Sequence, residues 1–391
     1  MRFLHTADLH IGKVVNEFSM LKEQEAALDQ ICSYAASYQV SAVILAGDLY
    51  DRSIPPAEAV SLMDAFLTRL ADLNICVMGI AGNHDSPERI SFASQILAGR
   101  GLYLSGTAQK ELCMTELKDE YGAVRFYLLP FSRPAVKKEL YGEDMPDFEA
   151  GVLAALLHNP PEPSLRNVLV AHEFVTSKGA DPVLSDSEVR VSVGGSDRVD
   201  AGCFAAYDYT ALGHIHRCQR IGEGNIWYAG SPVKYSFSEC GQDKSVNLVE
   251  LGKKGEVKVT QLPLKPLHDM RRIRGSLKEL TKEEIASLAD RRDYLAVELT
   301  DEEELFDPMS ALRSVYPNVM QLSIVKNLPL KQPEYQGAFG IREKDELELF
   351  EEFFLEVTGR QMDERRREMF RQRSEEHTSE LQSHTQLSYA V

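Results

Sequence analysis

The sequence lacks the features that mark membrane and secreted proteins. No apolar run approaches the roughly 20 residues that a membrane-spanning helix needs. The first residues lead from Met1 straight into polar Thr6 and Asp8, which leaves no room for a signal peptide. The six cysteines are scattered, with no Cys-x-x-Cys pair. Because disulfide frameworks belong to small secreted chains, we expect reduced thiols in a cytoplasmic protein that has no membrane segment.

Basic residues are also scarce relative to acidic ones. The chain has 43 Lys and Arg against 60 Asp and Glu, a formal net charge of −17. Phosphate binding depends on Lys and Arg, so this balance argues against a protein that coats nucleic acid. It does not exclude a nuclease, because bound divalent ions reverse the local field of a carboxylate-rich site. The length of 391 residues, 43% apolar and 26% charged, predicts a globular protein of two or three domains.

The first 265 residues alternate between predicted strands and helices. The apolar runs Arg2–Thr6, Ser41–Ala46 and Ile75–Ile80 have the length of buried strands, and amphipathic helical patterns separate them. This order implies right-handed crossovers and at least partly parallel strands. Later strands with shorter links could form a second sheet: Arg125–Leu129, Asn167–Ala171, Tyr209–Leu212 and Ile226–Ala229. The predicted fold class is α/β, a layered α/β sandwich over residues 1–265.

The pattern changes at about Pro266. Residues 266–330 predict a small α+β domain with strands at Arg271–Ser276, Tyr294–Leu299 and Val319–Val325. A helix is expected to start at Thr281, because Thr281 and Glu284 have capping-box spacing. Residues 331–372 predict a linker followed by helices. One helix has an apolar stripe, formed by Leu347, Phe350, Phe353, Phe354 and Val357. Such a stripe either docks into a groove of a partner or packs on the chain's own core.

The last segment, residues 373–391, is polar and has no helical or strand period, so we do not expect it to fold. It begins Arg-Ser-Glu-Glu-His-Thr-Ser-Glu-Leu-Gln-Ser-His, which resembles the in-frame translation of a common sequencing-library adapter. We interpret the segment as a non-native, adapter-derived extension that replaces the natural terminus. The alternative is a genuine disordered tail.

Five short polar segments end or follow predicted strands. In α/β sheets ligands bind at the carboxyl ends of strands, so we expect these side chains to converge. Five of the eight histidines before residue 373 lie in these segments; His5, His158 and His268 lie outside them, and we expect structural roles for those three. The segments are Asp8-Leu9-His10, Gly47-Asp48-Leu49-Tyr50-Asp51-Arg52, Gly82-Asn83-His84-Asp85, Ala171-His172-Glu173 and Gly213-His214-Ile215-His216.

The residue types in these segments predict a metal-dependent phosphoester hydrolase. Any one segment is a weak signal, since a lone His is more often a hydrogen-bonded structural residue than a ligand. Together, carboxylate, amide and imidazole ligands suit Mn²⁺, Fe²⁺ or Zn²⁺ better than Mg²⁺. Two such ions about 3.5–4 Å apart can activate water and neutralise the phosphoryl oxygens. A nearby His that binds no metal can then protonate the leaving oxygen.

The five segments resemble the motifs of the calcineurin-like metallophosphoesterases, and their context resembles the SbcD nucleases within that superfamily. Further stretches carry the resemblance, among them Ala229-Gly230-Ser231-Pro232 and Lys234-Tyr235-Ser236-Phe237-Ser238-Glu239. The resemblance covers about Met1 to Gln372. It implies a site with two ions that share one bridging ligand. One ion would be held by Asp8, His10 and His216, the other by Asn83, His172 and His214, and both by Asp48.

The resemblance also implies roles for residues that bind no metal. His84 would be the catalytic histidine, oriented by Asp85. Asp51 and Arg52 would brace the ligands by hydrogen bonding. No position of the implied ligand set is substituted, so we expect an active enzyme.

The activity implied by the resemblance is that of a Mn²⁺-dependent DNA nuclease in DNA repair, recombination and replication. It would act as a 3′→5′ exonuclease on double-stranded ends and as an endonuclease on hairpins. Residues 266–330 would cap the site and help to select DNA ends. Residues 331–372 would bind an SMC-like ATPase, SbcC, and the nuclease would be a homodimer within a heterotetramer.

Two other interpretations of the sequence stay open. The first is a metallophosphoesterase of small phosphomonoesters or cyclic nucleotides. The large region after the catalytic segments argues against it. The second is a phosphoesterase fold that serves as a non-catalytic scaffold. That interpretation predicts lost ligands, and all seven are present together with His84.

Overall fold

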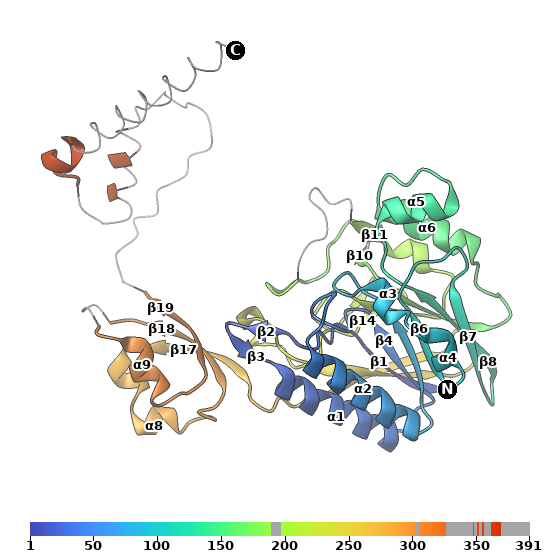
Figure 1. Ribbon diagram of the computed structural model, residues 1–391, viewed down its shortest axis with the longest axis horizontal. Helices are drawn as coiled ribbons and strands as arrows, with labels where there is room; N and C mark the ends of the chain where they lie inside the picture. The colour runs from blue at the N-terminus through green and yellow to red at the C-terminus, as the bar shows by residue number, and fades with distance from the viewer. Residues whose placement is uncertain are drawn as a thin grey trace, which may run out of the picture. The chain divides into compact units, whose positions relative to one another are not determined.

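The computed structural model describes residues 1–188, 197–301, 303, 305–325, 347, 350–351, 354–355 and 361–368 (Figure 1). The chain divides into two compact units, Met1–Val325 and Lys326–Val391, which are described separately. None of the helices in the described ranges is both long and apolar enough to cross a membrane.

A six-stranded sheet forms the first half of the Met1–Val325 unit, in the order β16-β15-β1-β4-β5-β6. The strands β1, β4, β5 and β6 are parallel, because helices cross over between them. The antiparallel pair β15 and β16 extends this sheet beyond β1 and was not predicted. The strands are β1 (Arg2–Thr6), β4 (Ala42–Ala46), β5 (Cys76–Ile80), β6 (Leu102–Ser105), β15 (Ser245–Leu251) and β16 (Val257–Pro263).

The second six-stranded sheet has the order β13-β14-β12-β9-β8-β7. Its inner strands β8, β9, β12 and β14 are parallel, and β7 and β13 are antiparallel strands at the two edges. The expected second sheet is therefore present. Its strands are β7 (Cys113–Asp119), β8 (Gly122–Leu129), β9 (Arg166–His172), β12 (Tyr209–Gly213), β13 (Gln219–Ile221) and β14 (Ile226–Tyr228).

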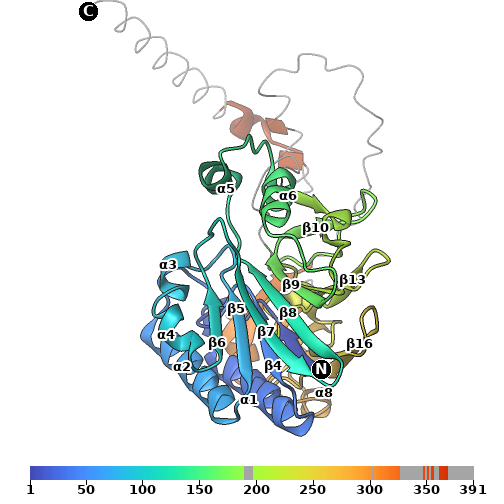
Figure 2. The same cartoon turned by 90° about the vertical axis from the view of Figure 1, so that its right-hand side faces the viewer.

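The two sheets pack face to face around a fully buried apolar layer (Figure 2). Phe3 of the first sheet contacts Phe126 and Tyr209 of the second, each ring edge-to-face at a centroid distance of 5.7 Å. Helices α1 (Leu21–Ser37) and α2 (Ala57–Asp72) share a second apolar core with the first sheet. Helix α6 (Phe148–His158), next to α5 (Pro134–Tyr141), shares a third with the second sheet. These layers confirm the predicted α/β sandwich.

Helix α1 shows how the sequence pattern produces this packing. Leu28, Ile31, Cys32 and Ala35 are spaced three and four residues apart, so they share one helical face, and all four are buried. The remaining short elements connect the layers: β2 (Val14–Val15), β3 (Phe18–Ser19), α3 (Pro87–Ile90), α4 (Ser94–Ala98), β10 (Phe174–Thr176), β11 (Arg198–Asp200) and the 3₁₀ helices η1 (Ala201–Phe204) and η2 (Phe237–Glu239).

Residues 266–325 form a smaller part of the same unit, which we call the β17–β19 module. Its three strands pair in parallel, so it is built from β-α-β units. The capping box lies at Ser276 and Glu279, one turn before the expected Thr281, because Ser276 is the residue that leaves β17 in extended conformation. The elements are β17 (Met270–Gly275), α7 (Leu277–Leu280), α8 (Glu283–Ala286), β18 (Tyr294–Leu299), α9 (Pro308–Arg313) and β19 (Val319–Ile324).

The second unit, Lys326–Val391, contains the expected apolar stripe. Leu347, Phe350 and Phe354 are helical and half-buried. Phe353 and Val357, the other two residues of the stripe, lie outside the described residues, as does the segment 373–391.

We expect the layer between the sheets to dominate stability. Phe3→Ala should destabilise the unit by about 3–5 kcal/mol, because it removes a fully buried ring and leaves a cavity. Leu157→Ala is the matched control, since Leu157 is 77% exposed and its loss should change stability by less than about 0.5 kcal/mol. Calorimetric thermal midpoints measure both effects. Equal midpoints for the two variants would contradict this assignment of the core.

Candidate metal centre

The five polar segments converge where parallel strands of the two sheets end. Asp8 and His10 follow β1, Asp48 follows β4, and Asn83 and His84 follow β5. From the second sheet, His172 ends β9, and His214 and His216 follow β12. The potential ligand atoms within each of three groups lie no more than 4.8 Å apart. The groups are Asp8 with His10 and His216, His10 with Asp48 and His84, and Asp8 with Asp48 and His172.

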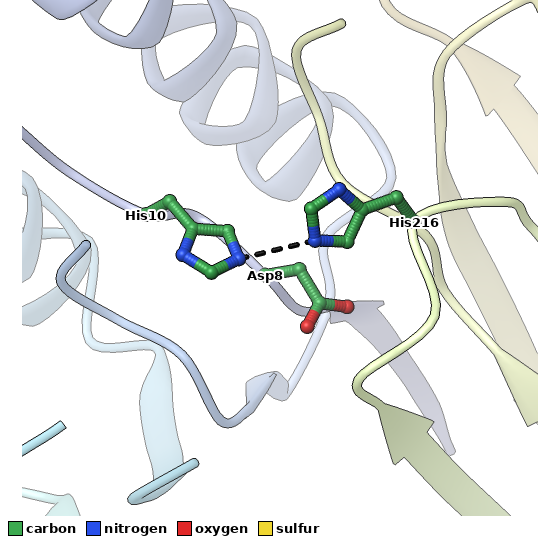
Figure 3. Close-up of side chains that lie close together, drawn as sticks. All are labelled: Asp8, His10 and His216. Atoms are coloured by element: carbon green, nitrogen blue, oxygen red, sulfur yellow. Dashed lines mark hydrogen bonds between the residues drawn. The ribbon is translucent and has the colours of Figure 1, made fainter. Parts of the chain in front are cut away.

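The first cluster joins Asp8, His10 and His216 (Figure 3). The Nε2 atoms of His10 and His216 lie 3.1 Å apart, with the Asp8 carboxylate beside both rings. Asp8 is fully buried, and its Oδ2 atom has no hydrogen-bond partner in the part of the chain that the structure describes. Burial raises the pKa of Asp8 to about 8 and lowers that of His10 to about 3. A cation here would be attracted to the carboxylate and bound by both imidazoles.

The second cluster is centred on the Asn83 side chain. Its Oδ1 atom lies 3.0 Å from His172 Nε2 and 3.0 Å from His214 Nδ1. Burial lowers the pKa of His214 to about 3, so its ring is neutral with a lone pair. Asp48 lies between the clusters, with Oδ2 3.4 Å from His172 Nε2 and 3.6 Å from His10 Nε2. This is the position from which one carboxylate can serve two ions.

The chemistry of these donors fits divalent metal ions. Two of the histidines have their second ring nitrogen engaged: His172 Nδ1 lies 2.8 Å from the Ala46 carbonyl, and His216 Nδ1 lies 2.7 Å from Ser187 Oγ. Metal-binding histidines commonly donate their other N–H in this way, which leaves Nε2 as the ligand atom. Mixed oxygen and nitrogen donors are suited to Mn²⁺, Fe²⁺ or Zn²⁺. The clusters therefore support two divalent ions, without identifying the metal.

The backbone at this site is held in an uncommon conformation. Asp8, His10, Asp48 and His214 have φ angles of 53°, 43°, 51° and 100°, in the left-handed region that residues with a Cβ rarely adopt. Such strain persists only where the surroundings enforce it, and it clusters at functional sites. Gly82 allows the close approach of the loops, because a Cβ at that position would collide with the backbone and side chain of Asp48.

Asp85 has a different role from the one expected. Its carboxylate accepts hydrogen bonds from the backbone N–H groups of Leu49, Tyr50 and Gly82, at 2.9–3.0 Å. Burial raises its pKa to about 6, and these three bonds oppose the rise. Asp85 thus ties the loop after β4 to the loop after β5. The Nδ1 atom of His84 lies 3.0 Å from the carbonyl oxygen of Asp51 instead.

Asp51 and Arg52 also differ from each other. Asp51 lies 3.8 Å from His10 Nδ1 and pairs with Lys13 at 2.6 Å, so it contacts a residue of the site. The side chain of Arg52 is 77% exposed, and its Nε lies 3.7 Å from Asp51. Arg52 is therefore free to meet a ligand from solvent and does not brace the site.

Several residues that support the site were missed in the sequence. Glu239 is fully buried, pairs with Lys244 at 2.5 Å and accepts a hydrogen bond from Ser187, which in turn contacts His216. Tyr235 donates to the carbonyl of Leu9 and lies against the His10 ring. Both residues belong to the stretch 234–239, whose family resemblance was the only signal for them.

Two family models match the chain. The model described as calcineurin-like phosphoesterase matches residues 1–218, and the model SbcD_C, described as type 5 capsule protein repressor C-terminal domain, matches residues 266–358. The SbcD subunit of the nuclease SbcCD from Staphylococcus epidermidis (strain ATCC 12228 / FDA PCI 1200) is 29% identical over 366 residues, which cover 93% of this chain and 95% of that protein. These findings confirm the resemblance to SbcD.

Two solved structures are more distant. A dimetal phosphatase from Danio rerio is 10% identical, covering 68% of this chain and 99% of its own, with a TM-score of 0.37. A protein of Thermus thermophilus is 13% identical, covering 66% of this chain and 98% of its own, with a TM-score of 0.39. At these TM-scores neither structure supports a further argument. The match over residues 1–218, more than half of its length, shows that the chain belongs to the calcineurin-like phosphoesterase family.

Proposed function

We propose that this chain is a Mn²⁺-dependent DNA nuclease that cleaves double-stranded ends in the 3′→5′ direction and opens hairpins. The observation that carries the proposal is the convergence of carboxylate, amide and imidazole groups in two adjoining clusters. The family supplies the reaction class, phosphoester hydrolysis. The relative named as part of a nuclease, similar over 93% of this chain, favours DNA over a small phosphoester as the substrate.

The seven clustered residues would hold two ions. When bound, the ions would supply activated water and neutralise charge on the phosphoryl oxygens. Asp48 is suited to bridge them because its Oδ2 atom faces His10 on one side and His172 on the other. One ion would be held by Asp8, His10 and His216, the other by Asn83, His172 and His214, and both by Asp48.

His84 is the proposed catalytic histidine. It is half-buried, and its ring meets that of His10 edge-to-face at 4.7 Å. With Nδ1 donating to the Asp51 carbonyl, Nε2 is available to a substrate oxygen. In this role His84 would deliver a proton from Nε2 to the leaving oxygen of the cleaved strand. Arg52, exposed in the same loop as Asp51, would contact a DNA phosphate.

The assembly proposed for the nuclease includes a second copy and a partner. Phe92 and Ile96, next to and within α4, are 79% and 78% exposed, which supports a homodimer interface on this surface. The name of the Staphylococcus epidermidis relative supports a partner of the SbcC type. The apolar stripe at Leu347, Phe350 and Phe354 would dock on that SMC-like ATPase in the cytoplasm, and the β17–β19 module would cap the DNA site.

Removing the proposed bridge should abolish metal binding. We expect Mn²⁺ to raise the thermal midpoint of the wild type, since a ligand at 100 times its Kd stabilises by about 2.7 kcal/mol. Asp48→Ala should lose most of this stabilisation. Asp144→Ala is the matched control, because Asp144 is an exposed carboxylate outside the clusters, and it should respond as the wild type does. A full Mn²⁺ response in Asp48→Ala would contradict the assignment of Asp48.

Removing the proposed acid should separate binding from chemistry. His84→Gln should bind Mn²⁺ normally but cleave DNA about 10²–10⁴-fold more slowly, because only proton delivery is lost. Cleavage of a labelled duplex and of a DNA hairpin, with Mn²⁺ and with and without the ATPase and ATP, measures the effect. His158→Gln, outside the clusters, is the control.

Two outcomes would count against this mechanism. Undiminished cleavage by His84→Gln would remove that residue from the chemistry. A wild type that leaves DNA intact even with its partner, yet hydrolyses a small phosphodiester, would favour the alternative substrate class.

The docking stripe makes a separate prediction. Phe350→Asp should abolish copurification with an SbcC-type ATPase while leaving Mn²⁺-dependent hydrolysis of a small phosphodiester unchanged, because it lies in the second unit. Leu355→Asp is the control, since Leu355 is exposed and outside the stripe. Retained copurification with Phe350→Asp would assign the stripe to the chain's own core.

A further inference from the structure

Helix α1 has two consecutive buried polar residues, Glu23 and Gln24. Consecutive residues on a helix point about 100° apart, so the two side chains enter different surroundings. Buried carboxylate and amide groups are unfavourable unless they are hydrogen-bonded. The partners of Glu23 and Gln24 belong to separate parts of the Met1–Val325 unit.

Glu23 holds the beginning of the β17–β19 module. Its Oε2 atom accepts hydrogen bonds from the backbone N–H groups of Leu267 and His268, at 3.0 and 3.1 Å. Its Oε1 atom lies 2.7 Å from His268 Nδ1 and 3.4 Å from the hydroxyl of Tyr294, the first residue of β18. One carboxylate thereby fixes the chain entering β17 and the start of the neighbouring strand.

Gln24 holds the loop that positions His10. Its side-chain amide donates to the carbonyl oxygens of Leu9, at 3.2 Å, and His10, at 2.7 Å. Its Oε1 atom accepts from the N–H of Gly12 at 3.0 Å. The His10 backbone has a φ of 43°, and these bonds help to hold it there.

Tyr235 gives a second connection between the same two regions. Gln24 donates to its hydroxyl at 3.0 Å, and its ring lies 5.7 Å from the His10 ring and 5.8 Å from the His216 ring. The same ring belongs to an apolar cluster with Met270 and three other residues of the module, Tyr294, Ala296 and Met320. The module and the metal-centre loop therefore meet at one helix and one tyrosine.

We propose that Glu23 and Gln24 are positioning residues that couple the placement of the β17–β19 module to the conformation of the His10 loop. The two residues share a peptide unit of a rigid helix, so a displacement of the module that moves Glu23 also moves Gln24. The module would thereby alter the affinity of the centre for its metal. The inference rests on the proposed function in that it takes His10 as a ligand.

Mn²⁺ affinity of the full chain, followed by the electron paramagnetic resonance signal of unbound Mn²⁺, tests the coupling. Gln24→Glu keeps the size of the side chain and the acceptor for Gly12, but loses the donors to Leu9 and His10. We expect about 10-fold weaker binding, the lower end of the effect of outer contacts on metal sites. Glu23→Gln contacts no proposed ligand, yet it should also weaken binding several-fold.

The double variant separates coupling from two independent effects. If Glu23 acts through Gln24, the affinity of the double variant should equal that of Gln24→Glu alone, because contacting residues show non-additive effects. The control is Gln30→Ala. Gln30 also lies on α1 and makes two hydrogen bonds with Lys265, at 2.8 and 2.9 Å, but it contacts neither the His10 loop nor the module strands. Its affinity should stay within about twofold of the wild type.

His268→Ala provides a milder variant if Glu23→Gln unfolds the chain, because it removes only the ring that contacts Glu23. It should weaken Mn²⁺ binding in the same direction. Wild-type affinity in both Glu23→Gln and His268→Ala, or effects that multiply in the double variant, would overturn the coupling alone. A wild type that binds no Mn²⁺ would overturn the proposed function, and the coupling with it.

Discussion

The structure depends on the attraction between a buried set of acids and imidazoles and the positive charge that they are arranged to receive. Asp8 and Asp48 lie at the junction of two sheets with almost no access to water. An uncompensated carboxylate in such a place is strongly unfavourable, as the raised pKa of Asp8 indicates. The neutral rings of His10 and His214 do not offset that charge; they add lone pairs directed at the same space. A divalent ion in each cluster would satisfy both requirements.

The supporting contacts follow from this demand. The loops at the site would relax from their left-handed backbone if nothing held them. Asp85 joins two of these loops through backbone N–H groups, and Gln24 holds a third through carbonyl oxygens. Glu239, itself balanced by Lys244, holds His216 through Ser187. Polar residues that look unremarkable in the sequence are therefore buried because the metal-centre loops need partners.

The sequence predicted best what depends on local pattern. The runs at Arg2–Thr6 and Tyr209–Leu212 became strands, because continuous apolar residues of that length are buried in a parallel sheet. The site residues at strand ends were predicted for the same reason, since topology brings those ends together. The ligand roles came from the family resemblance and remain a proposal.

What the sequence could not reveal depends on distant partners. The strand pair β15 and β16 was missed, although its register with β1 is regular. Thr281 and Ser276 both have a Glu three residues later, and only the end of β17 decides which one caps a helix. Asp85 was expected to orient its neighbour His84, but the backbone of the loop after β4 competes for its carboxylate. Glu23 and Gln24 resemble the solvent-facing polar positions of any amphipathic helix.

The position of β1 has a consequence for how the protein is made. This first strand of the chain lies inside its sheet, between β4 and β15, so one of its edges stays open until residues 245–251 have been synthesised. His10 and His216, which meet in the first cluster, are separated by 206 positions. Contacts of such long range slow folding and leave strand edges exposed during synthesis. The ribosome must therefore release most of the Met1–Val325 unit before its first ten residues find their final neighbours.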